Sequence, residues 1–202
     1  MRTNGLRLLV VAAGLCWGLA LASVTPEDLV RDTTNRMLGT LKAERVTINR
    51  EPGRVYDLVD AIVLPHFDFE RMSRLVLGVF WRQASADQRQ RFVRAFRDLL
   101  VRTYSRALDE YTGQKIIYLP FRAAPDAKEV VVRTEIRQPG SPPIPVDYRL
   151  YAVANAWKVF DVSIDGISLV TNYRSTFAND IRTKGLDALI ATLATRNQQE
   201  RK

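Results

Sequence analysis

Cysteine and histidine are almost absent from this chain of 202 residues, which contains one of each, Cys16 and His66. Cys16 lies in a leader that we expect to be removed, so the remaining chain has no thiol for catalysis, metal binding or a disulfide. One histidine cannot form a zinc cluster. No Gly-x-Ser-x-Gly motif, phosphate-binding loop or dinucleotide fingerprint occurs either. The sequence therefore predicts no catalytic residues, no metal and no cofactor.

Long hydrophobic runs are also scarce, and the single pronounced one stands at the start of the chain. Arg2 and Arg7 precede an apolar run over residues 8–21, and Ala20 and Ala22 supply the small-x-small pattern of a signal peptidase site. The run is short for a transmembrane helix. We therefore interpret residues 1–22 as a secretory signal peptide, with an uncleaved anchor as the alternative. A lipid-modified Cys16 is disfavoured because Leu15 precedes it.

The exported chain is basic, because the leader contains two arginines and no acidic residue while the whole chain has a net charge of +8. Outside the cytoplasm, anionic lipid head groups or acidic protein surfaces are more usual partners for a basic protein than nucleic acid. A solubilising role for the arginines is the alternative. The length suits a single domain, which we expect over residues 23–196, followed by a flexible polar tail at 197–202.

Helical periodicity occupies both ends of the chain. Thr25 and Pro26 predict a helix start, and Asp68 and Gly78 bracket a short helix. A long amphipathic helix with an aromatic face and an arginine face is expected over residues 85–111, with Ser85 and Gln88 as a capping box. Further helices are predicted near 51–63 and over 172–184 and 186–196.

The middle of the chain alternates with a period of two, which is typical of strands with one buried face. Four strands are predicted, at residues 115–119, 130–137, 146–153 and 157–162, with a turn at Asn155. Because helices flank an antiparallel meander, the expected fold class is α+β, with helices covering one face of a curved four-stranded sheet.

One carboxylate, that of Asp161, and one imidazole, that of His66, are the remaining catalytic candidates. Asp161 lies within an apolar strand, where burial would raise its pKa and suit it to act as a base, and His66 lies between Pro65 and Phe67. A structural role is favoured for both, because catalysis requires a second convergent polar group. An enzyme acting on an apolar small molecule through Asp161 or His66 is therefore kept as the alternative function.

Three segments resemble the MlaC family, the periplasmic phospholipid-binding component of an ABC transport system, also called the toluene-tolerance auxiliary protein. They are residues 64–78 (LPHFDFERMSRLVLG), residues 84–97 (ASADQRQRFVRAFR) leading to Tyr104 and Tyr111-Thr-Gly113, and residues 161–170 (DVSIDGISLV) followed by 182–189 (RTKGLDAL). They occur in order across essentially the whole exported chain. The resemblance implies an NTF2-like curved sheet with an apolar pocket, and a monomeric, soluble periplasmic carrier. That carrier would shuttle phospholipid between an outer-membrane lipoprotein complex and an inner-membrane ABC transporter to maintain outer-membrane lipid asymmetry.

Placed on that fold, the periodicity predicts a set of apolar residues that contact the acyl tails. They are Leu75, Leu77, Phe80, Phe96, Leu100, Tyr104, Tyr148, Leu150, Trp157, Val159, Ile164, Ile167 and Leu169.

Four outward arginines, Arg91, Arg94, Arg97 and Arg102, are candidates for docking an acidic partner or an anionic membrane, and a solvated face is the alternative. A module that binds toluene-like solvents is a third hypothesis, suggested by the family's older name.

Overall fold

The structure is a computed structural model that describes residues 24–199 except residues 52, 125 and 155. The described helices are α1 (Pro26–Ala43), α2 (Arg45–Arg50), α3 (Arg54–Ile62), the 3-10 helix η1 (Leu64–His66), α4 (Phe69–Leu77), α5 (Val79–Gln83), α6 (Ala86–Asp109), α7 (Leu169–Lys184) and α8 (Leu186–Gln199). The strands are β1 (Lys115–Tyr118), β2 (Glu129–Arg137), β3 (Ile144–Val153), β4 (Ala156–Ile164) and β5 (Ile167–Ser168). The predicted leader with Cys16, the turn residue Asn155 and residues 200–202 of the predicted tail lie outside the described residues.

Local capping rules account for where the longer helices begin. Thr25, Asp68 and Ser85 each accept a hydrogen bond from the backbone N–H three residues further on, at 3.1, 2.8 and 3.1 Å. At Ser85 the capping box is complete, because Gln88 Oε1 accepts from the Ser85 N–H at 2.9 Å. Gly78 ends α4 with φ +55, a conformation that a side chain would strain. The predicted start of α1 and both predicted ends of α4 and α6 are confirmed within two residues.

Several short elements were not predicted. Helices α2 and α5 have six and five residues, and β5 has two, so the sheet has five strands rather than four. Helix α7 begins at Leu169 instead of residue 172, because Ser168 Oγ accepts from the Thr171 N–H at 3.1 Å and caps it earlier. The expected start of the flexible tail, at residue 197, was also wrong. Asn197 is buried within α8 and donates through Nδ2 to the Ala95 carbonyl at 2.9 Å.

The sheet is an antiparallel meander in the order β1-β2-β3-β4-β5. Val132 lies opposite Tyr148 on β3, and Leu150 lies opposite Val159 on β4. The register shifts between Arg149 and Leu150, where β4 carries one extra residue. Such a bulge increases the local twist and bends the strand, which helps to curve the sheet. The expected α+β class, with a curved antiparallel sheet packed against helices, is confirmed.

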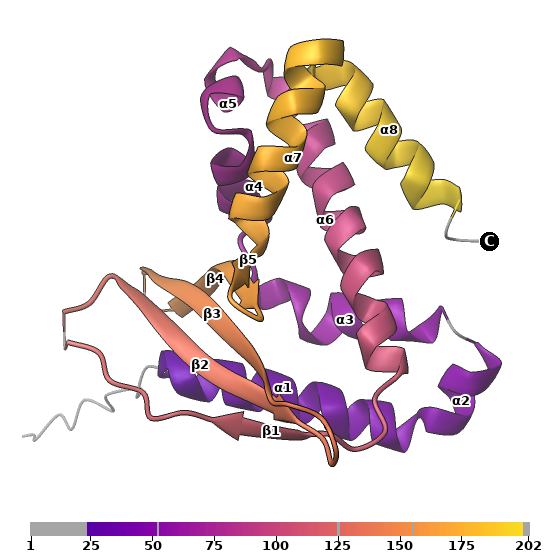
Figure 1. Cartoon of the computed structure of the whole chain (residues 1–202), viewed down its shortest axis with the longest axis vertical. Helices are drawn as coiled ribbons and strands as arrows, with labels where there is room; N and C mark the ends of the chain where they lie inside the picture. Colours follow the sequence, from indigo (N-terminus) through magenta and orange to yellow (C-terminus); the bar gives the residue numbers. More distant parts are fainter. Residues whose placement is uncertain (1–23, 52, 125, 155, 200–202) are drawn as a thin grey trace, which may run out of the picture.

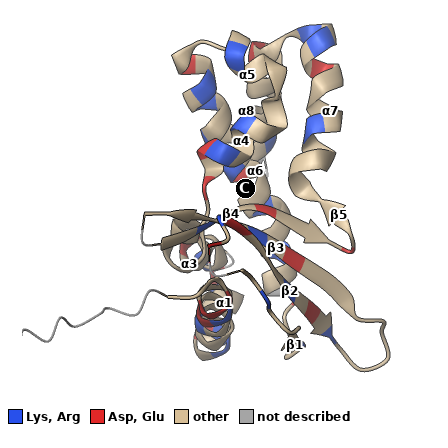
Figure 2. Cartoon of the chain, turned by 90° about the vertical axis from the view of Figure 1, so that its left-hand side faces the viewer, with Lys and Arg blue, Asp and Glu red and all other residues tan. Residues whose placement is uncertain are grey.

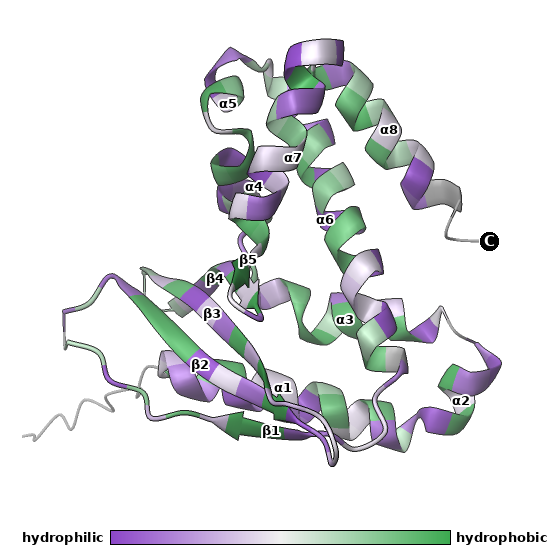
Figure 3. Ribbon diagram, in the orientation of Figure 1, coloured by the Kyte–Doolittle hydropathy of each residue, from purple (hydrophilic) through white to green (hydrophobic). Residues whose placement is uncertain are grey.

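The described part of the molecule has a lower and an upper section in Figure 1. The sheet lies with α1, α2 and α3 in the lower section, α4, α5, α7 and α8 form the upper section, and α6 runs between the two. Charged residues of both signs are distributed over the upper helices (Figure 2), and hydrophobic residues occur in the long strands and along α6 and α7 (Figure 3). Among the described helices, none has the length and apolar character needed to cross a membrane.

Candidate functional site

One face of the sheet, here called the apolar face, is the main candidate surface for an apolar ligand. Alternate residues of β2, β3 and β4 point to it, and the strand register places them side by side. The buried members are Val130, Val132, Thr134, Val146, Leu150, Val159 and Val162. All of these except Thr134 belong to one hydrophobic cluster with Val30 of α1 and Leu100 of α6. This face is therefore clustered with helix α1, at the start of the described chain, and with helix α6, in its middle.

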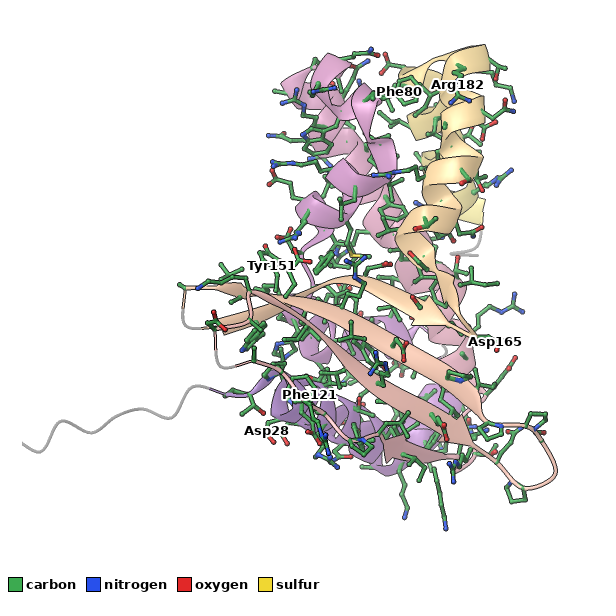
Figure 4. The ribbon with its side chains drawn as sticks, turned by 60° about the vertical axis from the view of Figure 1, so that its left-hand side comes forward. Asp28, Phe80, Phe121, Tyr151, Asp165 and Arg182 are labelled. Atoms are coloured by element: carbon green, nitrogen blue, oxygen red, sulfur yellow. The ribbon has the colours of Figure 1, made fainter. Side chains whose placement is uncertain are left out.

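The two faces of the sheet contact different helices. Figure 4 shows Phe121 on the side of the sheet that faces α1, and Tyr151 on the side that faces the upper helices. Arg71 of α4 lies 3.9 Å from the centroid of the Tyr151 ring, and Tyr151 donates a hydrogen bond to Asp68. The second face is therefore held by cation–π and hydrogen-bond contacts to α4, whereas the apolar face is lined almost entirely by hydrocarbon.

An aromatic cluster closes the interior at the upper end. Phe92 and Phe96 of α6 stack with ring centroids 5.7 Å apart, and Phe96 meets Tyr173 of α7 edge-on at 5.4 Å. Phe177 packs edge-on against Phe92 and Phe96 at 6.0 and 6.1 Å. Edge-to-face pairs at these distances are favourable beyond the area that they bury. This region is consequently a packed core.

A few hydroxyl groups interrupt the apolar interior. Burial, with Tyr118 and Thr134 as neighbours, raises the pKa of Tyr148 to about 12. Burial next to Tyr173 likewise raises the pKa of Tyr104 to about 12. The hydroxyls of Ser73 and Ser105 are buried without a hydrogen-bond partner in the described part of the chain. These hydroxyl groups stay neutral at ordinary pH, so they add polar groups to the interior without adding charge.

A cavity of about 230 Å³ opens at the edge of the apolar face. It lies between the start of α1 and the connection from β1 to β2, and Val130 and Trp157 of the sheet form part of its wall. The remaining lining residues are Val24, Thr25, Pro26, Phe121, Ala123, Ala124 and Ala127. Because the lining residues bear no formal charge and are mostly apolar, this opening suits hydrocarbon rather than an ionic group.

A second cavity, a groove of about 340 Å³, lies between α6 and α8 and has a different character. Ala95, Ile190 and Ala194 provide apolar walls, and small alanine side chains on facing helices leave the space unfilled. Charged and polar side chains provide the rest of the lining, namely Arg91, Arg94, Asp98, Arg102 and Asn197. We call this space the α6–α8 groove.

The predicted tail-contacting residues are only partly brought together. Six are buried in the main cluster, namely Leu77, Phe96, Leu100, Leu150, Val159 and Leu169, and Leu75, Tyr104, Tyr148, Trp157 and Ile164 are partly buried against it. Phe80 of α5 is also partly buried against this cluster, near the top of the upper helices (Figure 4). Ile167 is 60% exposed in the two-residue strand β5. Placing Ile167 in the apolar interior was therefore wrong, because β5 is a separate two-residue element at the edge of the sheet.

The four arginines predicted to face outward have different environments. Arg91 forms ion pairs with Asp87 and Asp187 at 2.6 and 2.7 Å, and hydrogen bonds from Arg91 and Gln88 lower the pKa of the Asp187 carboxyl. Arg94 is exposed.

Arg97 forms ion pairs with Asp60 and Asp98 at 2.9 and 3.0 Å. The prediction for Arg102 was wrong, since this side chain is only 6% exposed. Helix α8 packs against this side of α6, and no local signal in α6 indicates it.

Asp161 and His66 lie in separate parts of the structure. Asp161 is buried and accepts hydrogen bonds from Ser168 Oγ at 2.7 Å and from the Val170 N–H at 3.1 Å, so its oxygens anchor the start of α7. Partial burial near Lys158 and Arg36 lowers the pKa of His66 and favours its neutral form. No group of metal-binding side chains occurs among the described residues.

Sequence reasoning recognised the alternating face of β2 but left its members out of the site. Val130 and Val132 belong to the apolar face, and Val130 also lines the cavity at its edge. Their period-two pattern was the available signal. Phe121 carried no such signal, because the connection between β1 and β2 is irregular and only tertiary packing brings it to the cavity.

A curved antiparallel sheet with an apolar interior, joined to a helical section, defines a class of α+β proteins suited to hold apolar molecules. Comparison with protein families matches residues 31–195 to the family described as MlaC protein. Two known proteins are similar to this chain over most of its length. The toluene tolerance protein ttg2D of Pseudomonas putida is 33% identical over 185 residues, which cover 91% of this chain and 84% of that protein. The intermembrane phospholipid transport system binding protein MlaC of Haemophilus influenzae is 26% identical over 187 residues, with 91% and 87% covered.

A solved structure shows the same fold. The phospholipid-binding protein from Ralstonia solanacearum, determined in complex with a phospholipid, is 36% identical and superposes with a TM-score of 0.80. The match covers 87% of this chain and 98% of that one. This chain belongs to the MlaC family, as the three motif segments predicted.

Proposed function

We propose that this protein is a periplasmic carrier that holds the acyl tails of a phospholipid between the apolar face of its sheet and the surrounding helices. The observation that carries the proposal is the likeness, at 36% identity over 87% of this chain, to a protein whose structure contains a phospholipid. The apolar face and the cavity at its edge supply the matching chemistry in this chain. Family members are lipid-binding transport proteins, and we propose a non-enzymatic role here.

The physical need for such a carrier follows from the cost of hydrocarbon in water. Burial of one methylene is worth about 0.8 kcal/mol, so a tail of ~16 carbons is stabilised by roughly 12 kcal/mol in an apolar interior. Little directional chemistry is needed, which agrees with the scarcity of polar groups on the apolar face.

Lipid binding requires more room than the edge cavity has in this structure. Its volume of about 230 Å³ is below the ~300–1,000 Å³ that is usual for ligand pockets. We therefore expect α1 and the connection between β1 and β2 to move away from the sheet when tails enter. Val24, Phe121 and Trp157 line the cavity at the boundary where this movement would begin.

The direct test is extraction of lipid from the purified protein, followed by mass spectrometry. Phospholipid in a fixed ratio to protein supports the proposal, and delipidated protein should regain it from phospholipid vesicles. Protein that neither carries nor takes up phospholipid would contradict it. Uptake of toluene that is not displaced by phospholipid would instead favour the solvent-binding hypothesis.

The transport role requires a second experiment. We propose that the protein moves phospholipid between an outer-membrane lipoprotein complex and an inner-membrane ABC transporter, and thereby maintains outer-membrane lipid asymmetry. Deletion of the gene should raise the phospholipid content of the outer leaflet, and the wild-type gene should restore it. An unchanged outer leaflet in the deletion strain would oppose this role without affecting the lipid-binding proposal.

A further inference from the structure

Arg102 is a buried cation without a partner. Its side chain is 6% exposed, and its Nη1 atom is buried with no hydrogen bond. Among the described residues, Arg102 forms no ion pair or ring contact that would offset this burial. Burial of an unpaired charge is strongly unfavourable, and buried guanidinium groups are normally paired with an acid. The burial of Arg102 therefore indicates that its anionic partner is not among the described residues of the chain.

Arg102 lines the α6–α8 groove, so a ligand in the groove can reach it. Ala95 and Arg102 are seven residues apart on α6, which places them about two turns apart on the same face. The groove has a volume of about 340 Å³, which is within the ~300–1,000 Å³ range of small-molecule sites. Inorganic phosphate alone would leave much of that volume, and the apolar surfaces of Ile190 and Ala194, unused.

The other charges around the groove are already paired or lie at its rim. Arg91 is engaged by Asp87 and Asp187. Asp98, the one carboxylate among the lining residues, is paired with Arg97 at 3.0 Å. Arg94 is exposed and adds a positive charge that forms no ion pair with an acid among the described residues. The electrostatic environment of the groove is therefore positive, with Arg102 as its deepest charge.

We propose that the α6–α8 groove binds the phosphate group of an amphiphile through the guanidinium of Arg102, with the apolar part of the molecule against Ala95, Ile190 and Ala194. A guanidinium presents several N–H donors in a planar fork that matches phosphate oxygens. This site is separate from the sheet interior, because Phe96 packs toward Tyr173 of α7 whereas Ala95 lies toward α8. The inference does not depend on acyl tails binding under the sheet.

The experiment titrates the purified protein with two probes and follows the arginine Nε–Hε and backbone signals by NMR. The probes are inorganic phosphate and dihexanoyl phosphatidylglycerol below its micelle concentration. Both should shift the Arg102 signal and neighbouring amides of α6 and α8. In the R102M variant, the neighbouring amides of α6 and α8 should report binding weakened by at least ~10-fold, which corresponds to a loss of about 1.4 kcal/mol. R106Q, a change of an exposed arginine one turn further along α6, is the matched control and should bind as the wild type does.

The two probes distinguish the source of the phosphate. Tighter binding of dihexanoyl phosphatidylglycerol than of inorganic phosphate supports the amphiphile, whereas equal binding would overturn the proposal in favour of free phosphate. No saturable shift at Arg102 with either probe would overturn the proposal. Binding of a hexaglutamate peptide at these signals, with no response to either phosphate probe, would overturn the proposal in favour of an acidic protein partner.

A stability measurement separates a binding residue from a structural one. Because R102M removes an unpaired buried charge, the ligand-free variant should melt at least ~2 °C higher than the wild type, while it loses phosphate binding. A variant that melts lower and still binds phosphate would show that Arg102 is structural and would overturn the proposal. The binding of acyl tails under the sheet is measured separately, by lipid extraction. This inference and the carrier proposal can therefore fail independently.

Discussion

The carboxylate of Asp161 and the backbone N–H of Val170 are joined by a hydrogen bond of 3.1 Å that links β4 to the first turn of α7. The second carboxylate oxygen accepts from Ser168 Oγ at 2.7 Å. Because both oxygens are used by the start of α7, Asp161 orients the helix that packs over the aromatic cluster. The residue that the sequence offered as a general base therefore has a structural task.

Replacement of Asp161 by alanine should lower the free energy of unfolding by about 2–3 kcal/mol, since two buried donors lose a charged acceptor. D161N should cost less, because one amide oxygen can still accept. Urea denaturation monitored by circular dichroism measures both. D147A is the matched control on the neighbouring strand and should change stability by no more than ~0.5 kcal/mol. Equal effects of D161A and D147A would contradict the assigned role.

Filling the apolar face should reduce lipid binding. Val132 is 1% exposed on this face, and Val131 points to the opposite face of the same strand. V132W is expected to cost about 1–3 kcal/mol of stability and to lower the phospholipid recovered per protein by at least about half. V131W adds the same volume on the other side and should retain the lipid. The measurement is phosphorus content after delipidation and reloading, and full loading of folded V132W would refute the placement of the tails.

The pH dependence of stability between pH 7 and 5 should depend on His66, the only histidine in the chain. Its pKa in the folded protein is lowered from 6.5 by burial and by the nearby Lys158 and Arg36. The unfolded chain therefore binds a proton first as the pH falls, and stability decreases below about pH 6.5 until the lower folded pKa is passed. H66Q should remove this slope in thermal melts across the range. A slope of unchanged size in H66Q would assign it to other groups.

Loss of the capping box should destabilise α6 locally. S85A removes the acceptor of the Gln88 N–H bond at 3.1 Å and is expected to cost about 1 kcal/mol. S175A is the control, because that hydroxyl bonds only to the Thr171 carbonyl of its own helix, at 3.2 Å, and should change stability by less than ~0.5 kcal/mol. Chemical denaturation compares the two. A neutral S85A would mean that α6 is held by tertiary packing alone.

Prediction from sequence was most accurate where a local rule applies. Helix α4 has the predicted boundaries because Asp68 caps its first turn and Gly78 adopts a positive φ at its end. The alternating pattern of β2 correctly indicated its buried face. Elements α5 and β5 were missed because five and two residues are too short to show a period.

The candidate sites were less predictable than the fold. Hydrophobic periodicity identifies buried residues but does not separate those in a packed core, such as Phe96, from those at a cavity, such as Trp157. Phe80 shows the same limit, because its position depends on where α5 docks. The irregular connection that carries Phe121 has no periodic signal at all.

The order of helices and strands, the caps and the family motifs follow from the amino-acid sequence, because they depend on residues within a few positions of one another. The burial of Arg102 does not, since it results from the packing of α8 against α6, which the Asn197 to Ala95 hydrogen bond joins across 102 positions. Tertiary packing alone therefore decides which side chains face a cavity and which charge lacks a partner. Those two properties locate the two proposed binding sites.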